Sequence, residues 1–133
     1  MTHPILALQG TLVAALRGDT ELAALAPVFD APPNGREPPY VVIARHDVLP
    51  RDGDGTPGHE HRVLFHAWAT DASRKAVLAI AERVVAVALG ADLDSVSLIV
   101  PLRRHDRTDT AIDGGTGRAR AAVAMTFFTE PTG

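Results

Sequence analysis

The stretch from His59 to Leu89 constrains the fold most strongly, because it combines a strand, a short turn and a long helix. Residues 62–69 alternate between two faces, as in a half-buried strand, and the apolar face consists of Val63, Phe65, Ala67 and Ala69. After a polar turn at 70–73, where Ser73 suits a helix N-cap, apolar residues recur at three- and four-residue spacing up to Gly90: Val77, Ile80, Ala81, Val84 and Ala88. Because the turn is so short, we expect this helix to fold back over the sheet that contains its own strand.

Two helical pieces are predicted before this unit. Pro4 suits the first turn of a helix, and apolar residues at helical spacing continue that helix to Gly18. Thr20 is the expected N-cap of a short second helix over 21–25, which a proline ends. Four prolines and an Asn-Gly pair then predict an irregular connection over 28–39.

Further strands are predicted from β-branched, aromatic and alternating residues at 40–45, 96–107 and 118–129. Pro101 removes one ladder hydrogen bond, so its strand should lie at a sheet edge or carry a bulge. Segments rich in glycine and aspartate predict two protruding loops, at 47–61 and 108–117. The expected fold is a single α+β domain over 1–133: helix, two strands, helix, two strands, with a mainly antiparallel sheet and the long helix packed on one face.

Composition limits the function classes. A chain of 133 residues suits one domain, and 13 basic against 16 acidic side chains give a formal net charge of −3, which argues against a protein that mainly grips nucleic acid phosphates. The sequence has no cysteine, which excludes disulfides and thiolate metal sites. We see neither a secretory signal nor a membrane-spanning run, so we expect a protein that is made in the cytoplasm and does not enter a membrane.

Signs of catalysis or metal binding are weak. His59, Glu60 and His61, with His66 further along, are residue types that bind metals, but no further ligand follows at a characteristic spacing. We interpret these histidines as solvated or hydrogen-bonded, and we expect no cofactor and no catalytic residue. The serines lie outside any Gly-x-Ser-x-Gly motif, so a small metal-dependent enzyme is only a minor alternative.

A basic cluster is more informative. If the last two strands form a hairpin about 108–117, five arginines should gather at one end of the sheet: Arg103, Arg104, Arg107, Arg118 and Arg120. Three interpretations stay open. The arginines form a solvated face that discourages edge-to-edge pairing, or they contact DNA phosphates, or they form a subunit interface for which the acidic 47–60 loop is a complementary partner.

Several segments spread over nearly the whole chain carry a family resemblance. They are the N-terminal alanine- and leucine-rich helix, Pro39-Tyr40-Val41-Val42-Ile43, the glycine–aspartate loop, the strand Glu60–Ala69 with its His-Arg-x-x-x-His-x-Trp pattern and the helix after it, and the closing strand Arg118–Pro131. In combination they resemble the tail completion, or tail terminator, family of long-tailed phages and phage-like gene transfer agents. These are residues that determine a fold rather than a catalytic site.

The resemblance implies an α+β subunit that assembles into a six-membered ring at the head-proximal end of a tail tube. Such a ring would stop tube polymerisation and dock the tail to the head connector, and DNA would pass through its channel without sequence-specific binding. The implied partners are further copies of the chain, the tail tube protein and the head connector or stopper protein, at the head–tail junction of a virion or phage-like particle. A head–tail stopper or adaptor, or a tail-tube protein, is the alternative role.

A ring needs two different complementary surfaces on each subunit, so we expect the loops and the charged strands to form the interfaces. His66 and Trp68 belong to this set because they should lie on the sheet face opposite the helix. The hypothesis comprises Asp47, Arg51, Asp52, Asp54, His59, Glu60, His66, Trp68, Arg103, Arg104, Arg107, Arg118 and Arg120.

Overall fold

A computed structural model describes residues 3–51 and 57–132 of the chain. In chain order the elements are α1 (Pro4–Gly18), α2 (Thr20–Leu25), β1 (Val28–Phe29), β2 (Tyr40–Pro50), β3 (His59–Trp68), α3 (Arg74–Gly90), β4 (Leu98–Ile112) and β5 (Ala119–Pro131). The predicted α+β class is therefore confirmed.

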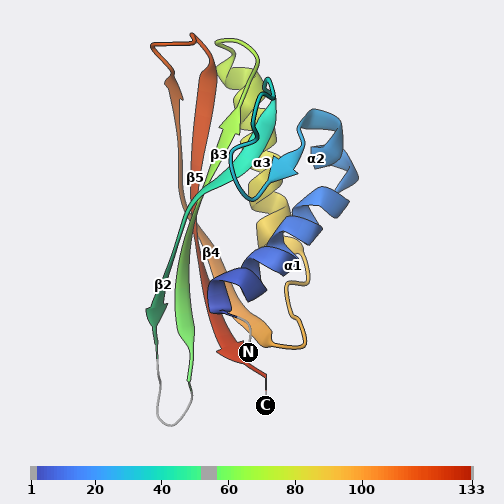
Figure 1. Ribbon diagram of the computed structural model, residues 1–133, viewed down its shortest axis with the longest axis vertical. Coiled ribbons are helices and arrows are strands. Elements are labelled where there is room, and N and C mark those ends of the chain that lie inside the picture. Colours follow the sequence, from blue (N-terminus) through green and yellow to red (C-terminus); the bar gives the residue numbers. More distant parts are fainter. Residues whose placement is uncertain (1–2, 52–56, 133) are drawn as a thin grey trace.

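The described strands form one sheet in the order β1-β2-β3-β5-β4. All neighbouring strands in it are antiparallel except β1 and β2, which are parallel. Figure 1 shows α1, α2 and α3 on the same side of this sheet, and it places the end of β2 and the start of β3 at the opposite end of the molecule from the β4–β5 turn. One face of the sheet is thus covered by helices, and we call the other the uncovered face.

The core lies between the sheet and the helices. On β3 the odd-numbered side chains from His61 to Ala67 are buried, and Phe65 is completely inaccessible to solvent. On α3 the buried stripe contains Val77, Ile80, Ala81, Val84, Val87 and Ala88. The Ser73 hydroxyl accepts a hydrogen bond from the Ala76 N–H at 3.0 Å, which confirms the predicted N-cap.

The start of α2 differs from the prediction. Its N-cap is Asp19 rather than Thr20, because the Asp19 carboxylate accepts a hydrogen bond from the Leu22 N–H at 2.9 Å. The same carboxylate binds the guanidinium of Arg83 on α3 through two contacts of 2.7 Å. A residue that both caps α2 and fixes α2 to α3 outcompetes the neighbouring threonine.

The strands are longer than predicted, and the loops are shorter. β2 continues to Pro50 and β3 begins at His59, so both ends of the predicted loop 47–61 belong to strands, and residues 52–56 of that loop lie outside the described residues. Similarly, β4 continues to Ile112, so residues 113–118 replace the loop 108–117. A further difference is β1, which lies within the predicted irregular connection. Polar residues extend the strands because half of each strand faces away from the core, where charged side chains cost little.

The prediction for Pro101 is confirmed. β4 is an edge strand of the sheet, and its register against β5 shifts between Ile99 and Leu102. A proline fits there because its missing N–H is not required by a regular ladder. None of the described helices is long and apolar enough to span a membrane.

We expect Phe65→Ala to lower the free energy of unfolding by about 3–5 kcal/mol, because it leaves a cavity beneath α3. Leu64→Ala, on the uncovered face of the same strand, is the matched control and should cost less than half as much. Urea denaturation followed by circular dichroism measures both. Equal losses would contradict a core on one side of β3.

Candidate interaction surfaces

The uncovered face carries rows of charged side chains across neighbouring strands. In one row Asp47, Arg62, Thr126 and Arg104 follow each other across β2, β3, β5 and β4. A shallow hollow of about 320 Å³ lies at the centre of this face. It is lined by Arg45, Asp47, Arg62, Val63, Leu64, Arg104, Asp106, Ala124, Met125 and Thr126.

These charges are paired along the strands. Alternate residues of a strand project to the same face, so an arginine and an acid two positions apart can meet. The pairs, with their closest N–O distances, are Arg45–Asp47 at 2.9 Å, Arg62–Glu60 at 2.9 Å, Arg104–Asp106 at 2.7 Å and Arg107–Asp109 at 2.8 Å. Exposed pairs of this kind add little stability, but they neutralise the face locally.

Glu60 is the buried member of this network, with 2 % of its surface exposed. The guanidinium of Arg51 contacts its Oε1 at 2.6 Å, and that of Arg62 contacts its Oε2 at 2.9 Å. The hydrogen bond from Arg51, together with that from Arg62, holds the pKa of the Glu60 carboxyl below its usual value despite the burial. Glu60 therefore stays ionised and fixes the base of the β2–β3 hairpin, and the exposed groups are the two arginines.

His66 and Trp68 project from β3 on the uncovered face, as predicted. Both are half-buried, with His66 between Val42 and Ala122 in the register, and Trp68 between Tyr40 and Arg120. Burial, followed by the nearby charge of Arg120, lowers the pKa of His66. His59, another expected interface residue, lies opposite Pro50 and Thr129 at the base of the hairpin.

The five arginines do not gather at one end of the sheet, which corrects that prediction. Arg120 pairs with Ala111 near the β4–β5 turn, whereas Arg104 pairs with Thr126 well along the ladder. Arg118 forms an ion pair with Glu37, and the Nε of Arg120 is buried without a hydrogen-bond partner among residues 3–51 and 57–132. The register spreads these residues because β4 is longer than the sequence pattern indicated.

Arg103 lies on the helix-covered side, unlike Arg104. Its guanidinium donates hydrogen bonds to the carbonyl oxygens of Ala88 at 3.0 Å and Ala91 at 2.6 Å, at the end of α3. Ala88 belongs to the last turn of α3 and Ala91 is its C-cap residue, so Arg103 lies where carbonyl acceptors lack partners and the helix dipole attracts a cation. Two other residues expected in the interface, Asp52 and Asp54, lie outside the described residues.

A chain of hydrogen-bonded polar groups lies beneath the helices at the base of the β2–β3 hairpin. The amide nitrogen of Gln9 on α1 is 3.1 Å from His46 Nδ1, and His46 Nε2 is 2.8 Å from His61 Nδ1. His61 Nε2 is in turn 3.0 Å from the Thr129 hydroxyl on β5. The chain thus connects α1 to three strands.

The donors and acceptors of this chain follow from its first member. Because the Gln9 amide nitrogen can only donate, His46 Nδ1 accepts and His46 Nε2 carries the proton that it donates to His61. His61 Nε2 then donates to Thr129. Burial lowers the pKa of both histidines from 6.5 to about 4, so both rings are neutral at pH 7.

His46 is absent from the predicted site residues because the predicted strand 40–45 ends before it. The alternation along β3 does indicate a buried histidine, since His61 lies an even number of residues from Val63 and Phe65 and therefore on the core side. His46 pairs with Val63 in the register and therefore also faces the helices. The interpretation of His61 as hydrogen-bonded is confirmed.

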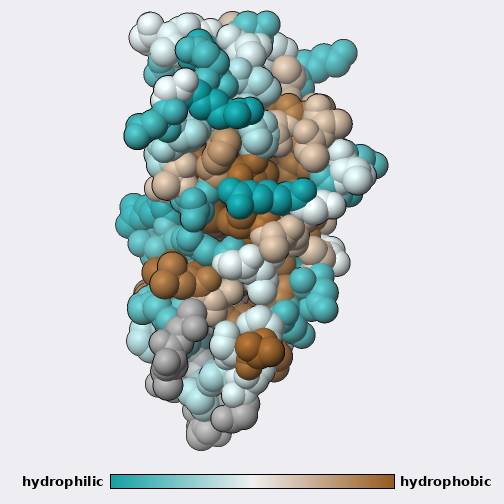
Figure 2. Space-filling view, turned by 45° about the vertical axis from the view of Figure 1, so that its right-hand side comes forward, coloured by the Kyte–Doolittle hydropathy of each residue, from teal (hydrophilic) through white to brown (hydrophobic). Residues whose placement is uncertain are grey.

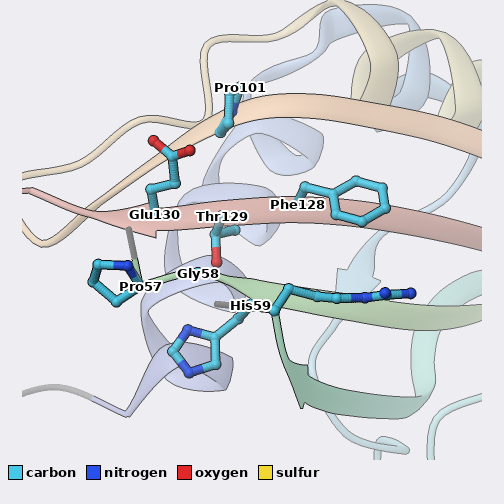
Figure 3. Close-up of a pocket in the computed structure, with 8 residues that line it drawn as sticks. Pro57, Gly58, His59, Pro101, Phe128, Thr129 and Glu130 are labelled. Carbon is cyan, nitrogen blue, oxygen red and sulfur yellow. The ribbon is translucent and has the colours of Figure 1, made fainter. Parts of the chain in front are cut away.

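A second hollow, of about 210 Å³, lies where the hairpin base meets β5 and β4. Figure 3 shows Pro101, Phe128, Glu130 and His59 around it. Gly58 is required here, because an added Cβ would lie 2.9 Å from the Arg51 carbonyl oxygen. In the described part of the chain no group of three or more His, Asp or Glu side chains is placed to hold a metal.

The family model described as Tail completion protein gp17 matches residues 10–129 of this chain. The chain therefore belongs to this family and is a structural protein of a phage-type tail. Among curated protein sequences none matches the chain significantly.

The fold also occurs in a solved particle. The structure is similar to a chain of the "Virion of native gene transfer agent (GTA) particle", with a TM-score of 0.83. The match covers 98 % of this chain and 99 % of that chain at 22 % sequence identity. At this identity the comparison shows a shared fold.

The histidine pair should make the protein sensitive to mild acid. Both groups have a lower pKa folded than unfolded, so the unfolded chain binds more protons between pH 6.5 and pH 4. We expect the free energy of unfolding to fall in that interval by roughly 5 kcal/mol for the two histidines together. Denaturant titrations at a series of pH values measure it.

The double variant His46→Gln, His61→Gln should lose most of this pH dependence, whatever its stability at pH 7. His105→Gln changes an exposed histidine on β4 and is the control that should keep it. A wild-type stability that stays constant between pH 6.5 and pH 4 would contradict a buried neutral pair.

Arg103 should matter for stability. We expect Arg103→Ala to lower the free energy of unfolding by about 1–2 kcal/mol, because the carbonyl oxygens of Ala88 and of the C-cap residue Ala91 lose a charged donor. Arg107→Ala, on the exposed edge strand, should change it by less than about 0.5 kcal/mol. Thermal melts compare the two, and indistinguishable melting temperatures would argue against the capping role.

Proposed function

We propose that this protein is a tail terminator, which forms a ring, of six subunits by the family resemblance, on the head-proximal end of the tail tube. The ring stops tube polymerisation and docks the tail to the head connector. The observation that carries the proposal is the family match over residues 10–129, which includes all or most of every helix and strand.

The two flanks of the sheet support assembly into a ring. At one flank β4 is an edge strand, and at the other β1 covers only Val41 and Val42 of β2. A subunit with two different flanks can make heterologous, head-to-tail contacts, which close into a ring when the rotation between subunits allows it. Bulges in β2 and β4 limit uncontrolled pairing of these edges.

The paired charges of the uncovered face suit a ring through which DNA passes without being bound. Proteins that hold DNA direct unpaired arginines and lysines at its phosphates. Here Arg45, Arg62, Arg104 and Arg107 are each bound to an acid on the same strand. This arrangement favours passage over binding.

The residues of the proposed interface differ in how accessible they are to a partner. Arg51, Arg104 and Arg107 are exposed and can reach a neighbouring protein, and Asp47, His59, His66, Trp68, Arg118 and Arg120 are partly accessible. Glu60 contributes indirectly by holding Arg51 and Arg62, and Arg103 contributes indirectly by holding the end of α3. Asp52 and Asp54 lie outside the described residues and stay part of the proposed interface.

Deleting the gene from a strain that makes the particle should produce overlong tail tubes without heads, because nothing stops tube growth. Electron microscopy of the particles measures tube length, and complementation with the wild-type gene is the control. Negative-stain images of the purified protein should show rings. Tailless heads that leak DNA, without overlong tubes, would contradict the terminator role and indicate a head–tail stopper.

A further inference from the structure

A groove lies between α3 and the edge strand β4. It has a volume of about 540 Å³, and its walls include Leu78, Glu82 and Val85 from α3 and His105 and Thr108 from β4. Leu78 lies beside the buried stripe of the helix and is 42 % exposed. The groove is therefore a largely apolar surface at the end of the helical layer.

The helix α1 has an exposed face of unusual composition. Figure 2, which brings the side with α1 and α2 forward, shows hydrophobic surface in the middle of that side. Exposed residues on α1 recur at four-residue spacing as Leu6, Gly10, Ala14 and Gly18. Leu6 is 64 % exposed, and the one charged residue in Pro4–Gly18 is Arg17.

No contact among the described residues explains the glycine at position 10 in the middle of α1. Glycine in the middle of a helix is destabilising relative to alanine. A Cβ at Gly10 would meet nothing within 4 Å among residues 3–51 and 57–132. Gly10 therefore costs helix stability without serving a contact in the described subunit. A glycine at such a position would allow the backbone of another subunit to approach closely.

We propose that α1 of one subunit packs into the α3–β4 groove of the next subunit, so that the exposed face of α1 is buried in the assembly. The two surfaces lie on different flanks of α3. Arg83 binds Asp19 on the flank towards α2, whereas Leu78 and Val85 line the groove on the other flank. Contacts between different flanks are head-to-tail, as a ring requires.

Charge and shape both favour a second copy as the occupant. Glu82 lines the groove and forms no ion pair with another described residue, and the helix that would enter brings Arg17. The small residues of α1 allow its backbone to approach closely, and Leu6 supplies an apolar side chain for the groove. The inference rests on the proposed ring but specifies which surfaces form it.

Disulfide crosslinking tests the contact cleanly, because the chain has no cysteine of its own. We expect a mixture of the Gly10→Cys and Leu78→Cys variants to give a covalent dimer on oxidation, whereas each variant alone stays uncrosslinked. A chain that carries both substitutions should give a ladder of covalent oligomers. Ala76→Cys, two residues from Leu78 and therefore on the other flank of α3, is the control partner and should not crosslink.

Each outcome decides the proposal. Rings in electron micrographs without a crosslink between positions 10 and 78, or between 14 and 78 with Ala14→Cys, would overturn it and leave the proposed function standing. Crosslinked dimers from Gly10→Cys alone would indicate a symmetric contact and also overturn it. A crosslinked ladder without closed rings would support the contact but contradict the ring.

Gly10→Leu gives an independent readout. Leucine is a better helix former than glycine, and a Cβ at this position meets nothing within 4 Å among residues 3–51 and 57–132, so the melting temperature of the monomer should rise. Because the added side chain keeps α1 out of the groove, the oligomeric fraction in sedimentation velocity should fall. An unchanged or larger oligomeric fraction would overturn the proposal.

Discussion

Burial of a single face of one sheet is the constraint on which the rest of this structure depends. α1, α2 and α3 lie on the same side, so the apolar side chains of β3 and β5 gather there, with Phe65 and Phe127 completely buried. Removal of this apolar surface from water is the main source of stability for a domain without disulfides. The opposite face must then stay compatible with water or with a partner. Its strands meet that demand with arginine–carboxylate pairs two residues apart.

The same constraint explains the polar groups beneath the helices. A buried polar atom without a hydrogen bond is costly, so polar residues on the covered face occur in satisfied sets. Gln9, His46, His61 and Thr129 form one such set, and it ties α1 to the long hairpin. Arg103 at the end of α3 and Asp19 between α2 and α3 do the same for the helices. The helical layer is therefore held to the sheet by directional contacts as well as by apolar packing.

For an assembly protein, what stays uncovered is as informative as what is buried. The family match makes this chain a structural protein of a phage-type tail, and the similar chain in a gene transfer agent particle shares its fold. The surfaces that one subunit leaves open are the uncovered face, the edge of β4, the α3–β4 groove and the exposed face of α1 with its single charge, Arg17. The first is neutralised within itself, and the last two complement each other. This difference supports the proposed ring, in which subunits bind their neighbours and DNA passes through the channel.

The sequence by itself determined the α+β class, the strand–turn–helix unit, the Ser73 cap and the edge position of Pro101. Each of these depends on residues close in the chain, whose period or backbone chemistry already restricts the structure. Only the tertiary structure decided the lengths of β2 and β4, the choice of Asp19 as the α2 cap, the spread of the arginines and the pairing of His46 with His61. These features depend on cross-strand register and on contacts between residues far apart in the chain, such as Asp19 with Arg83. A local pattern contains no information on which distant residue lies opposite, and that partner decides whether a polar side chain is solvated, paired or buried.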